Sequence, residues 1–319
     1  MNEANGQDDW CFKALVVLLS ARAHRDYHGR SELIYHKLKT GESKGEAMPG
    51  LIVFVGIAPH PPLLVPEVGG NRIAQVADSQ RALRELSRRL VNTSPETVVV
   101  ISPHSPLDPR AFTARSTDEL AGDFRDFYAP EVRLAFKNDL DLLRAMGHAA
   151  YDEGVELLEL KRDHPLDHGA LVPLYYLAEA GWSGPIIVCG FTLQSNDKHL
   201  AFGRAISRAA RELGRRVAIV ASGDLSHRLI VGGPYAFEPT AHLFDEQIVG
   251  SIATGDAVKA LNVDPDLRER AGECGFRSIV IALGSVDQSP RDHQVLSYEG
   301  PFGVGYMVAI LLEENKSDA

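Results

Sequence analysis

An apolar run that stops abruptly at a cluster of prolines constrains this chain more than any other feature. Residues 51–57 read LIVFVGI, and a short run this rich in β-branched residues is typical of a strand buried on both faces. Pro59, Pro61 and Pro62 follow, and proline cannot continue a sheet ladder. His60 is therefore expected on a stiff turn at the carboxyl end of a central strand, where open α/β sheets build their sites.

Strand-like and helix-like segments alternate along the rest of the chain. The predicted strands are 51–57, 97–101, 132–136, 155–160, 185–190, 216–221, 294–299 and 303–312. The predicted helices are 75–91, 139–153, 170–180, 197–213 and 276–283. Asn138 is the expected N-cap of the helix that follows it, and 117–130 is expected to be a polar loop. With no internal repeat, this alternation predicts an α/β fold, a single three-layer αβα domain around a largely parallel or mixed sheet.

The composition limits the classes of partner that are expected and indicates the cellular compartment. The net charge is −10 and no Lys/Arg-rich block with interleaved aromatic residues is present, so nucleic acid is not an expected partner. No apolar run approaches the roughly 20 residues of a membrane span, so no membrane partner is expected. Cys11, Cys189 and Cys274 are odd in number and form no CxxC pair, which favours a reducing, cytoplasmic location over a disulfide framework.

Several predicted strands end close to a histidine. These histidines are His60, His104, His168 with its neighbour His164, and His227. Because the carboxyl ends of neighbouring parallel strands converge on one crevice, their side chains are expected to meet there, and Glu273 could join them from a glycine-flanked turn. Two histidines and one carboxylate hold Fe(II) in mononuclear non-haem sites and leave positions open for O₂ and a chelating substrate. A further neutral histidine could move a proton.

Five short motifs occur in one order along the chain. They are PHPP (59–62), SPH (102–104), DHG (167–169), SGDLSH (222–227) and GECG (272–275). Together they resemble the class III extradiol ring-cleavage dioxygenases, a superfamily that includes the β subunit of protocatechuate 4,5-dioxygenase and the related Memo family. The resemblance covers roughly residues 51–312.

The resemblance implies a set of site residues and a reaction. His60, His104 and Glu273 would bind Fe²⁺, His227 would be the acid/base histidine, and His168 would lie in the substrate pocket. The implied reaction inserts both atoms of O₂ into a catecholic ring next to the diol, as in aromatic compound catabolism. The implied partners are a catechol-type substrate and O₂, with a homodimer or a small partner subunit as the expected assembly.

The same resemblance gives the expected domains. Residues 50–313 would form the catalytic domain, 1–49 a loosely attached N-terminal extension and 314–319 a charged tail.

Remaining candidates for contact with the substrate are His164, Asp224 and Cys274. Arg125 and Arg228 are candidate contacts for a substrate carboxylate.

Two other functions stay open at this point. The Memo-like branch of the superfamily uses a cysteine near Cys274, and a thiolate would make the site softer and favour copper or zinc. The chain would then be a metal-binding or redox-regulatory protein without ring-cleaving activity, and the discriminating feature is whether Glu273 or Cys274 joins the histidines. A zinc hydrolase that activates water at the same histidines is the third hypothesis.

Overall fold

The structure is a computed structural model that describes residues 51–162, 164–287, 289–290 and 292–314. The expected N-terminal extension, 1–49, and all but the first residue of the expected tail, 314–319, lie outside these residues. Expectations about those two segments, and about the domain boundaries that depend on them, stay predictions.

An eight-stranded mixed sheet forms the centre of the described fold. Its strand order is β6-β3-β7-β2-β8-β1-β10-β9. The four central strands, β1 (Ile52–Ala58), β8 (Val217–Ser222), β2 (Thr97–Ile101) and β7 (Ile186–Gly190), are parallel to one another. The outer strands are β3 (Phe112–Arg115), β6 (Leu157–Leu160), β9 (Gln294–Glu299) and β10 (Tyr306–Glu313). β10 and β3 each run antiparallel to the central strand that they join.

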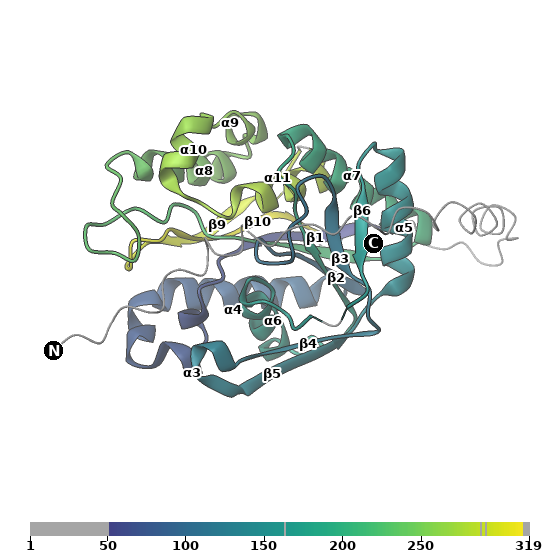
Figure 1. Cartoon of the computed structure of the whole chain (residues 1–319), viewed down its shortest axis with the longest axis horizontal. Helices are drawn as coiled ribbons and strands as arrows, with labels where there is room; N and C mark the ends of the chain where they lie inside the picture. Colours follow the sequence, from purple (N-terminus) through teal and green to yellow (C-terminus); the bar gives the residue numbers. More distant parts are fainter. Residues whose placement is uncertain (1–50, 163, 288, 291, 315–319) are drawn as a thin grey trace, which may run out of the picture. The chain divides into compact units, whose positions relative to one another are not determined.

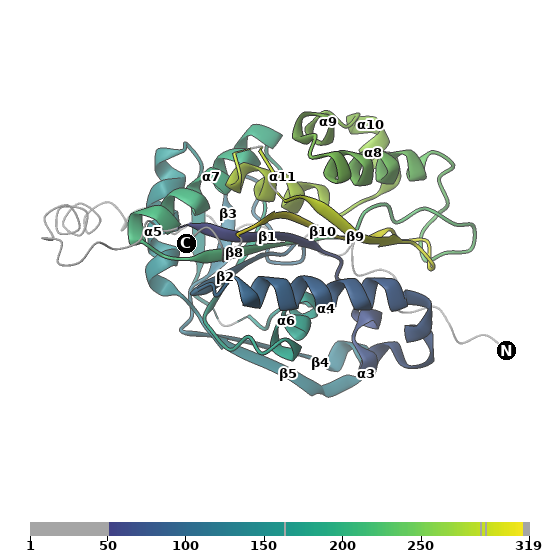
Figure 2. The same ribbon diagram turned by 180° about the vertical axis from the view of Figure 1, so that it is seen from behind.

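Helices cover both faces of this sheet (Figures 1 and 2). On one face lie α4 (Ala77–Asn92) and α6 (His168–Glu179), and on the other α5 (Leu140–Asp152), α7 (Asn196–Leu213) and α11 (Phe276–Ser285). Successive residues of the central strands enter opposite cores: Val98 and Val100 pack on the α4/α6 side and Val99 on the other. This double burial explains the continuous apolar runs, because both faces of a parallel sheet are covered. The predicted three-layer α/β fold is confirmed.

Further helical elements complete the two outer layers. After β1 come η1 (Pro62–Leu64), α3 (Pro66–Gly69) and η2 (Gly70–Val76), and after β8 come α8 (Ala241–Thr254), α9 (Ala257–Leu261) and α10 (Pro265–Ala271). In the part of the chain that the structure describes, no helix is long and apolar enough to cross a membrane.

One predicted loop is wrong. Residues 117–130 were expected to be irregular, but β4 (Glu119–Phe124) and β5 (Ala129–Lys137) form a separate two-stranded antiparallel sheet joined by η3 (Arg125–Phe127). Only Leu120 and Phe124 of β4 are buried, so the apolar signal of this strand is weak. Pairing in the folded chain, which the local pattern does not encode, decides its conformation.

The predicted cap of α5 is also wrong, by one residue. Asp139 caps the helix by accepting a hydrogen bond from Leu142 N. The Asn138 amide instead donates to the carbonyl oxygens of Arg115 and Thr117 and so ties the two sheets together.

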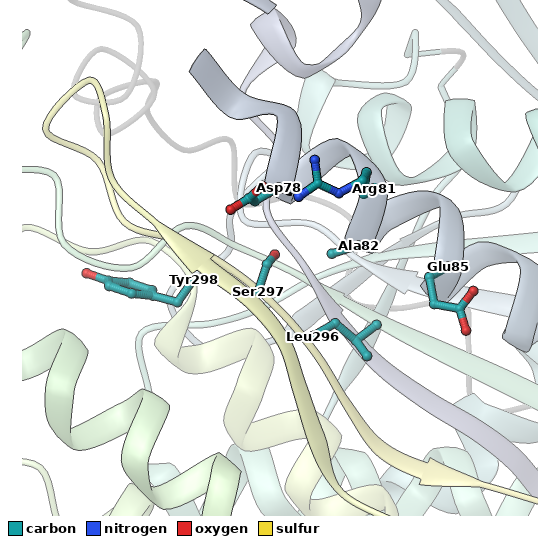
Figure 3. A pocket seen from close by; sticks show the side chains of 7 residues that line it. All are labelled: Asp78, Arg81, Ala82, Glu85, Leu296, Ser297 and Tyr298. Atoms are coloured by element: carbon teal, nitrogen blue, oxygen red, sulfur yellow. Dashed lines mark hydrogen bonds and ion pairs between the residues drawn. The ribbon is translucent and has the colours of Figure 1, made fainter. Parts of the chain in front are cut away.

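A hollow of about 340 Å³ lies at one edge of the main sheet, between α4 and β9. Figure 3 shows its lining, which consists of Asp78, Arg81, Ala82, Glu85, Leu296, Ser297 and Tyr298. Asp78 and Arg81 pair with each other there. None of the candidate site residues lines this hollow, so it is separate from the histidine cluster described next.

Candidate metal site

Three adjacent parallel strands deliver most of the candidate residues to one edge of the sheet. His60 follows β1, His104 follows β2, and Asp224 and His227 follow β8, which lies between them. The register pairs Ala58 of β1 with Ser222 of β8, so these two strands end at the same level. The predicted convergence at the carboxyl ends of parallel strands therefore holds for these residues.

His168 reaches the cluster by another route. The strand that precedes it, β6, is parallel to β3, and β3 is antiparallel to the central β7, so β6 does not end at the same edge. The strand-end argument was wrong for this histidine. His168 is instead the first residue of α6, whose N-cap, Asp167, accepts a hydrogen bond from Ala170 N. Its ring centroid lies 4.0 Å from that of His104.

Two glycines, Gly223 and Gly275, bring Cys274 into place beside the histidines. A Cβ at Gly223 would overlap Gly275 Cα, so the SGD and GECG segments approach each other backbone against backbone. Gly275 N donates to Asp224 O at 2.9 Å, and Asp224 N lies 3.4 Å from Cys274 Sγ. Close backbone approach requires glycine, and here it places Cys274 beside the histidines.

The donor atoms form two overlapping groups. Those of His60, His104 and Cys274 lie within 4.8 Å of one another, and so do those of Asp224, His227 and Cys274. His60 Nε2 lies 3.1 Å from His104 Nε2 and 3.6 Å from Cys274 Sγ. Metal–nitrogen bonds of about 2.0–2.1 Å and metal–sulfur bonds of about 2.3 Å are compatible with these separations, so the first group fits one shared ion.

A chain of hydrogen bonds fixes the tautomer of His60. The Ser222 hydroxyl donates to Gly169 O, so its oxygen is left to accept from His60 Nδ1, which lies 3.0 Å away. The proton is therefore on Nδ1, and the lone pair of Nε2 faces the cluster. Such outer partners orient ligating histidines and raise their basicity. The backbone of His60 is also held, because its N–H donates to Asp224 Oδ1 at 3.0 Å.

A buried ion pair supports the DHG motif. Asp167 pairs with Arg115 at 3.2 Å and also accepts from the Ser102 hydroxyl. A Cβ at Gly169 would overlap that same hydroxyl. Burial raises the pKa of Asp167, but the hydrogen bond from Ser102 and the charges around it outweigh burial and hold the pKa below its usual range. The network therefore locks the segment that carries His168 onto the segment that carries His104.

His227 is buried, with one ring nitrogen that lacks a hydrogen-bond partner among the described residues, Nε2. Its backbone N–H donates to Ala271 O, and its ring stacks on Tyr235 with centroids 4.9 Å apart. The preceding Ser226 N donates to Asp245 Oδ1 at 2.8 Å. A buried nitrogen without a partner is costly, so this one is suited to a ligand or a transferred proton.

Burial keeps the four clustered histidines neutral. It is the largest cause that lowers the pKa of His227, to about 4, and of His168, to about 3. It also lowers the pKa of His60 well below its usual value and that of His104 to a lesser degree. Neutral imidazole has a lone pair for a metal ion or a proton. Burial raises the pKa of Asp224 to about 7, although the hydrogen bond from His60 N opposes this.

Two candidate residues lie apart from this cluster. Glu273 turns its buried carboxylate to the start of α11, where Oε2 accepts from Phe276 N at 2.6 Å and Oε1 lies 3.7 Å from Arg268 Nε. Its position is that of a helix cap, and its neighbour Cys274 joins the histidines instead. His164 is exposed and contributes its carbonyl oxygen to Arg115.

The sequence reasoning missed the residues that support the site. Ser222 orients His60, Asp167 braces His168, and the aromatic rings of Phe127 and Tyr235 contact His168 and His227. Ser222 and Asp167 belong to the SGDLSH and DHG motifs. Their membership in these motifs was the signal that could have identified them as supporting residues. Phe127 and Tyr235 lie in segments 117–130 and 228–239, which could be expected to supply pocket walls, but no motif singles out either aromatic residue.

The fold and the cluster define an α/β protein with a candidate metal site of two histidines and a cysteine at the carboxyl ends of its central strands. The chain belongs to the LigB family: the model described as "Catalytic LigB subunit of aromatic ring-opening dioxygenase" matches residues 55–309. The predicted relationship to the class III extradiol dioxygenases is thereby confirmed at the level of the family.

Individual relatives give further comparisons. Protein CA_C1420 of Clostridium acetobutylicum is 31% identical over 260 residues, which are 79% of this chain and 56% of that protein. The chain thus spans little more than half the length of this relative. The 3,4-dihydroxyphenylacetate 2,3-dioxygenase of Escherichia coli is 23% identical over 228 residues, 67% of this chain and 82% of the enzyme.

A solved structure supports the fold. The crystal structure of the uncharacterized protein JW3007 from Escherichia coli K12 superimposes with a TM-score of 0.52 at 16% identity, covering 82% of this chain and 99% of that one. At this level of identity the similarity concerns the fold alone.

Proposed function

We propose that the chain binds one transition-metal ion through His60, His104 and Cys274 and acts as a thiolate-ligated metal protein of the Memo-like kind. One observation carries the proposal: Cys274, and not Glu273, lies with the two histidines. A thiolate is a soft ligand and favours copper or zinc over the harder iron site that a carboxylate would complete. The choice between Glu273 and Cys274 separates the dioxygenase from the Memo-like hypothesis, and the position of Cys274 favours the Memo-like one.

The chain's own residues support the roles that such a site needs. Ser222 presents the lone pair of His60 Nε2, and burial leaves His104 neutral and able to bind. His227 has a free position at Nε2 for a proton or a ligand. A bound copper ion would supply electron transfer, and a bound zinc ion would supply Lewis acidity.

The proposal is tested by loading the protein with one equivalent of Cu, Zn or Fe(II) in competition and measuring which metal it retains. We expect copper or zinc to be retained and iron to be lost on dialysis, with a thiolate-to-metal charge-transfer band in the copper form, because most sites prefer copper to iron and retention alone does not identify the thiolate. Preferred retention of iron would contradict the proposal. Ester turnover by the zinc form would favour the hydrolase hypothesis.

A second function is favoured by a different observation. Nε2 of His227, which is buried and has no hydrogen-bond partner among the described residues, and the neutral His168 lie around the same site, as an extradiol dioxygenase would need for proton transfer from a catechol. In this function the metal is Fe²⁺, the substrate is catechol-type and O₂ is the co-substrate. Oxygen uptake with a panel of catechols, matched by a yellow ring-opened product, would support it. Without such uptake by metal-loaded protein, the first function stands.

A further inference from the structure

Arg228 lies where the segment that carries His227 meets the turn that carries Cys274. It follows His227 directly, and its guanidinium packs on the turn before Cys274: a Cβ built on Gly272 would lie 3.0 Å from Arg228 Nε. Its backbone is held by hydrogen bonds, with its N–H donating to Ser226 Oγ and its carbonyl accepting from Glu238 N. The side chain is half-buried. Arg228 therefore places a cation, on an anchored backbone, at the margin of the candidate metal site.

The guanidinium of Arg228 makes no hydrogen bond or ion pair with any residue that the structure describes. Glu238 is the acidic group near it, but the groups that donate to the Glu238 carboxylate are the N–H and the hydroxyl of Thr240. These hydrogen bonds are the largest causes that lower the pKa of Glu238, and the charge of Arg228 is a smaller cause in the same direction. Arginines elsewhere around the cluster are occupied. Arg115 pairs with Asp167, Arg125 with Asp123, and Arg268 with Glu273, while Arg277 stacks over Phe191.

A half-buried guanidinium without acceptors is suited to a ligand. It carries five N–H donors in a planar fork that matches the two oxygens of a carboxylate. The chain has a net charge of −10, which disfavours the approach of anions. An anionic ligand at this site therefore needs a local cation.

We propose that Arg228 binds the carboxylate of an organic acid that enters beside the His60–His104–Cys274 site. This inference deepens the proposed function and rests on it, because it takes the metal site as the place where the rest of the ligand lies. Arg125, the other candidate for a substrate carboxylate, is excluded from this role by its two-pronged contact with Asp123.

The test compares benzoate with its neutral isostere benzamide as probes of the full-length chain, by isothermal titration calorimetry. It is run on the protein as isolated and again with excess chelator, so that a carboxylate bound directly to a metal is not counted. We expect benzoate to bind about 10-fold or more tightly than benzamide. Arg228→Met should weaken benzoate binding by about 10- to 100-fold, the effect of losing a charge-assisted hydrogen bond, and leave benzamide unaffected.

Two further variants keep the test decisive. Arg228→Lys keeps the charge without the fork and should lose only part of the effect, which covers the case in which the Met variant fails to fold. Arg270→Met removes a nearby arginine that donates to Thr240 and should change nothing. Equal binding of the two probes by the unaltered protein would overturn the inference, as would a loss that follows Arg125→Met instead.

Metal content measured on the same samples separates this inference from the proposed function. Protein that retains none of the added metal before chelation, but still prefers benzoate through Arg228, would refute the metal site alone. Protein that holds copper or zinc and shows no preference would refute the role of Arg228 alone.

Discussion

At the scale of single residues, the central fact is that one serine selects the ligand nitrogen of His60. Ser222 donates to Gly169 O and accepts from His60 Nδ1, so Nε2 is left to face the cluster. Without this partner, the ring could protonate Nε2 and turn its donor atom away. The hydroxyl is therefore as much a part of the site as the imidazole that it holds.

Ser222→Ala should lower metal affinity about 10- to 100-fold, the usual cost of removing an outer partner of a metal-binding histidine. The metal dissociation constant, measured by competition with a chromophoric chelator, checks this. Ser285→Ala is the matched control, because that buried hydroxyl donates within its own helix to Ala282 O. Equal affinities in the two variants would show that Ser222 does not select the tautomer.

The sequence predicted which residues lie in the cluster better than it predicted the role of each one. His60, His104 and His227 could be found because each follows a recognisable strand of a parallel sheet. The choice between Glu273 and Cys274 could not be made, because adjacent residues in a turn point in different directions and a linear pattern does not encode those directions. The cap interaction of Glu273 with Phe276 N is visible only in the folded chain.

At the scale of elements, the site depends on loops that touch without side chains between them. Gly223, which follows β8, and Gly275, which precedes α11, are in backbone contact, and Asp224 O accepts from Gly275 N. The cysteine therefore takes its place from the packing of two loops and not from a local ligand spacing.

Gly223→Ala should separate these loops, because the new Cβ would overlap Gly275 Cα. We expect a loss of unfolding free energy of about 1–3 kcal/mol or more, as for other overpacked positions, together with loss of the metal. Urea unfolding and metal analysis measure the two effects. Gly147→Ala, in the middle of α5 with nothing within 4 Å, should instead gain about 0.5–1 kcal/mol. A fully stable, metal-replete Gly223→Ala variant would contradict the packing argument.

The Arg115–Asp167 pair gives a second prediction at this scale. Arg115→Met would leave Asp167 buried without its countercharge and should cost about 3–5 kcal/mol in urea unfolding. Adding Asp167→Asn in the same chain should restore part of that stability, because it removes the uncompensated charge. If the single and double variants proved equally stable, the pair would not be what braces the DHG segment.

Element prediction succeeded where burial is strong and failed where it is weak. The central strands are apolar along their whole length, so their positions could be predicted to within a residue or two. β4 and β5 are half-exposed and pair with each other outside the main sheet. The sequence of β4 resembles a polar loop, because its stabilising contacts come from the folded molecule, whereas 132–136, within β5, was predicted to be a strand.

At the scale of the whole molecule, buried titratable groups couple stability to pH. Burial lowers the pKa of five described histidines: His60, His104, His168, His199 and His227. The unfolded chain binds these protons near pH 6.5 and the folded chain does not, so stability falls as the pH drops below that value. The raised pKa values of Asp224, Asp245 and Glu273 act in the opposite sense, but they are fewer.

His199 allows this effect to be measured away from the metal site. Burial lowers its pKa to about 4, with Arg277 and Arg268 adding to the effect and the carbonyl oxygens of Ser195 and Thr192 opposing it. Its share of the stability loss should be about 1.4 kcal/mol per pH unit between roughly pH 6.5 and 4. His199→Gln should therefore flatten the pH dependence of the urea-unfolding free energy of metal-free protein by that amount. An unchanged slope would mean that His199 is already protonated in the folded state.

The measurement that tests the central claim most directly is the metal content of Cys274→Ser beside that of Glu273→Gln. The two residues are neighbours in one turn, so the variants differ in which side chain is changed and in little else. We expect Cys274→Ser to lose the metal, together with the thiolate-to-metal charge-transfer band of a cobalt- or copper-loaded sample. Glu273→Gln should retain both. The opposite result, with metal lost in Glu273→Gln and kept in Cys274→Ser, would return the site to a two-histidine, one-carboxylate iron centre.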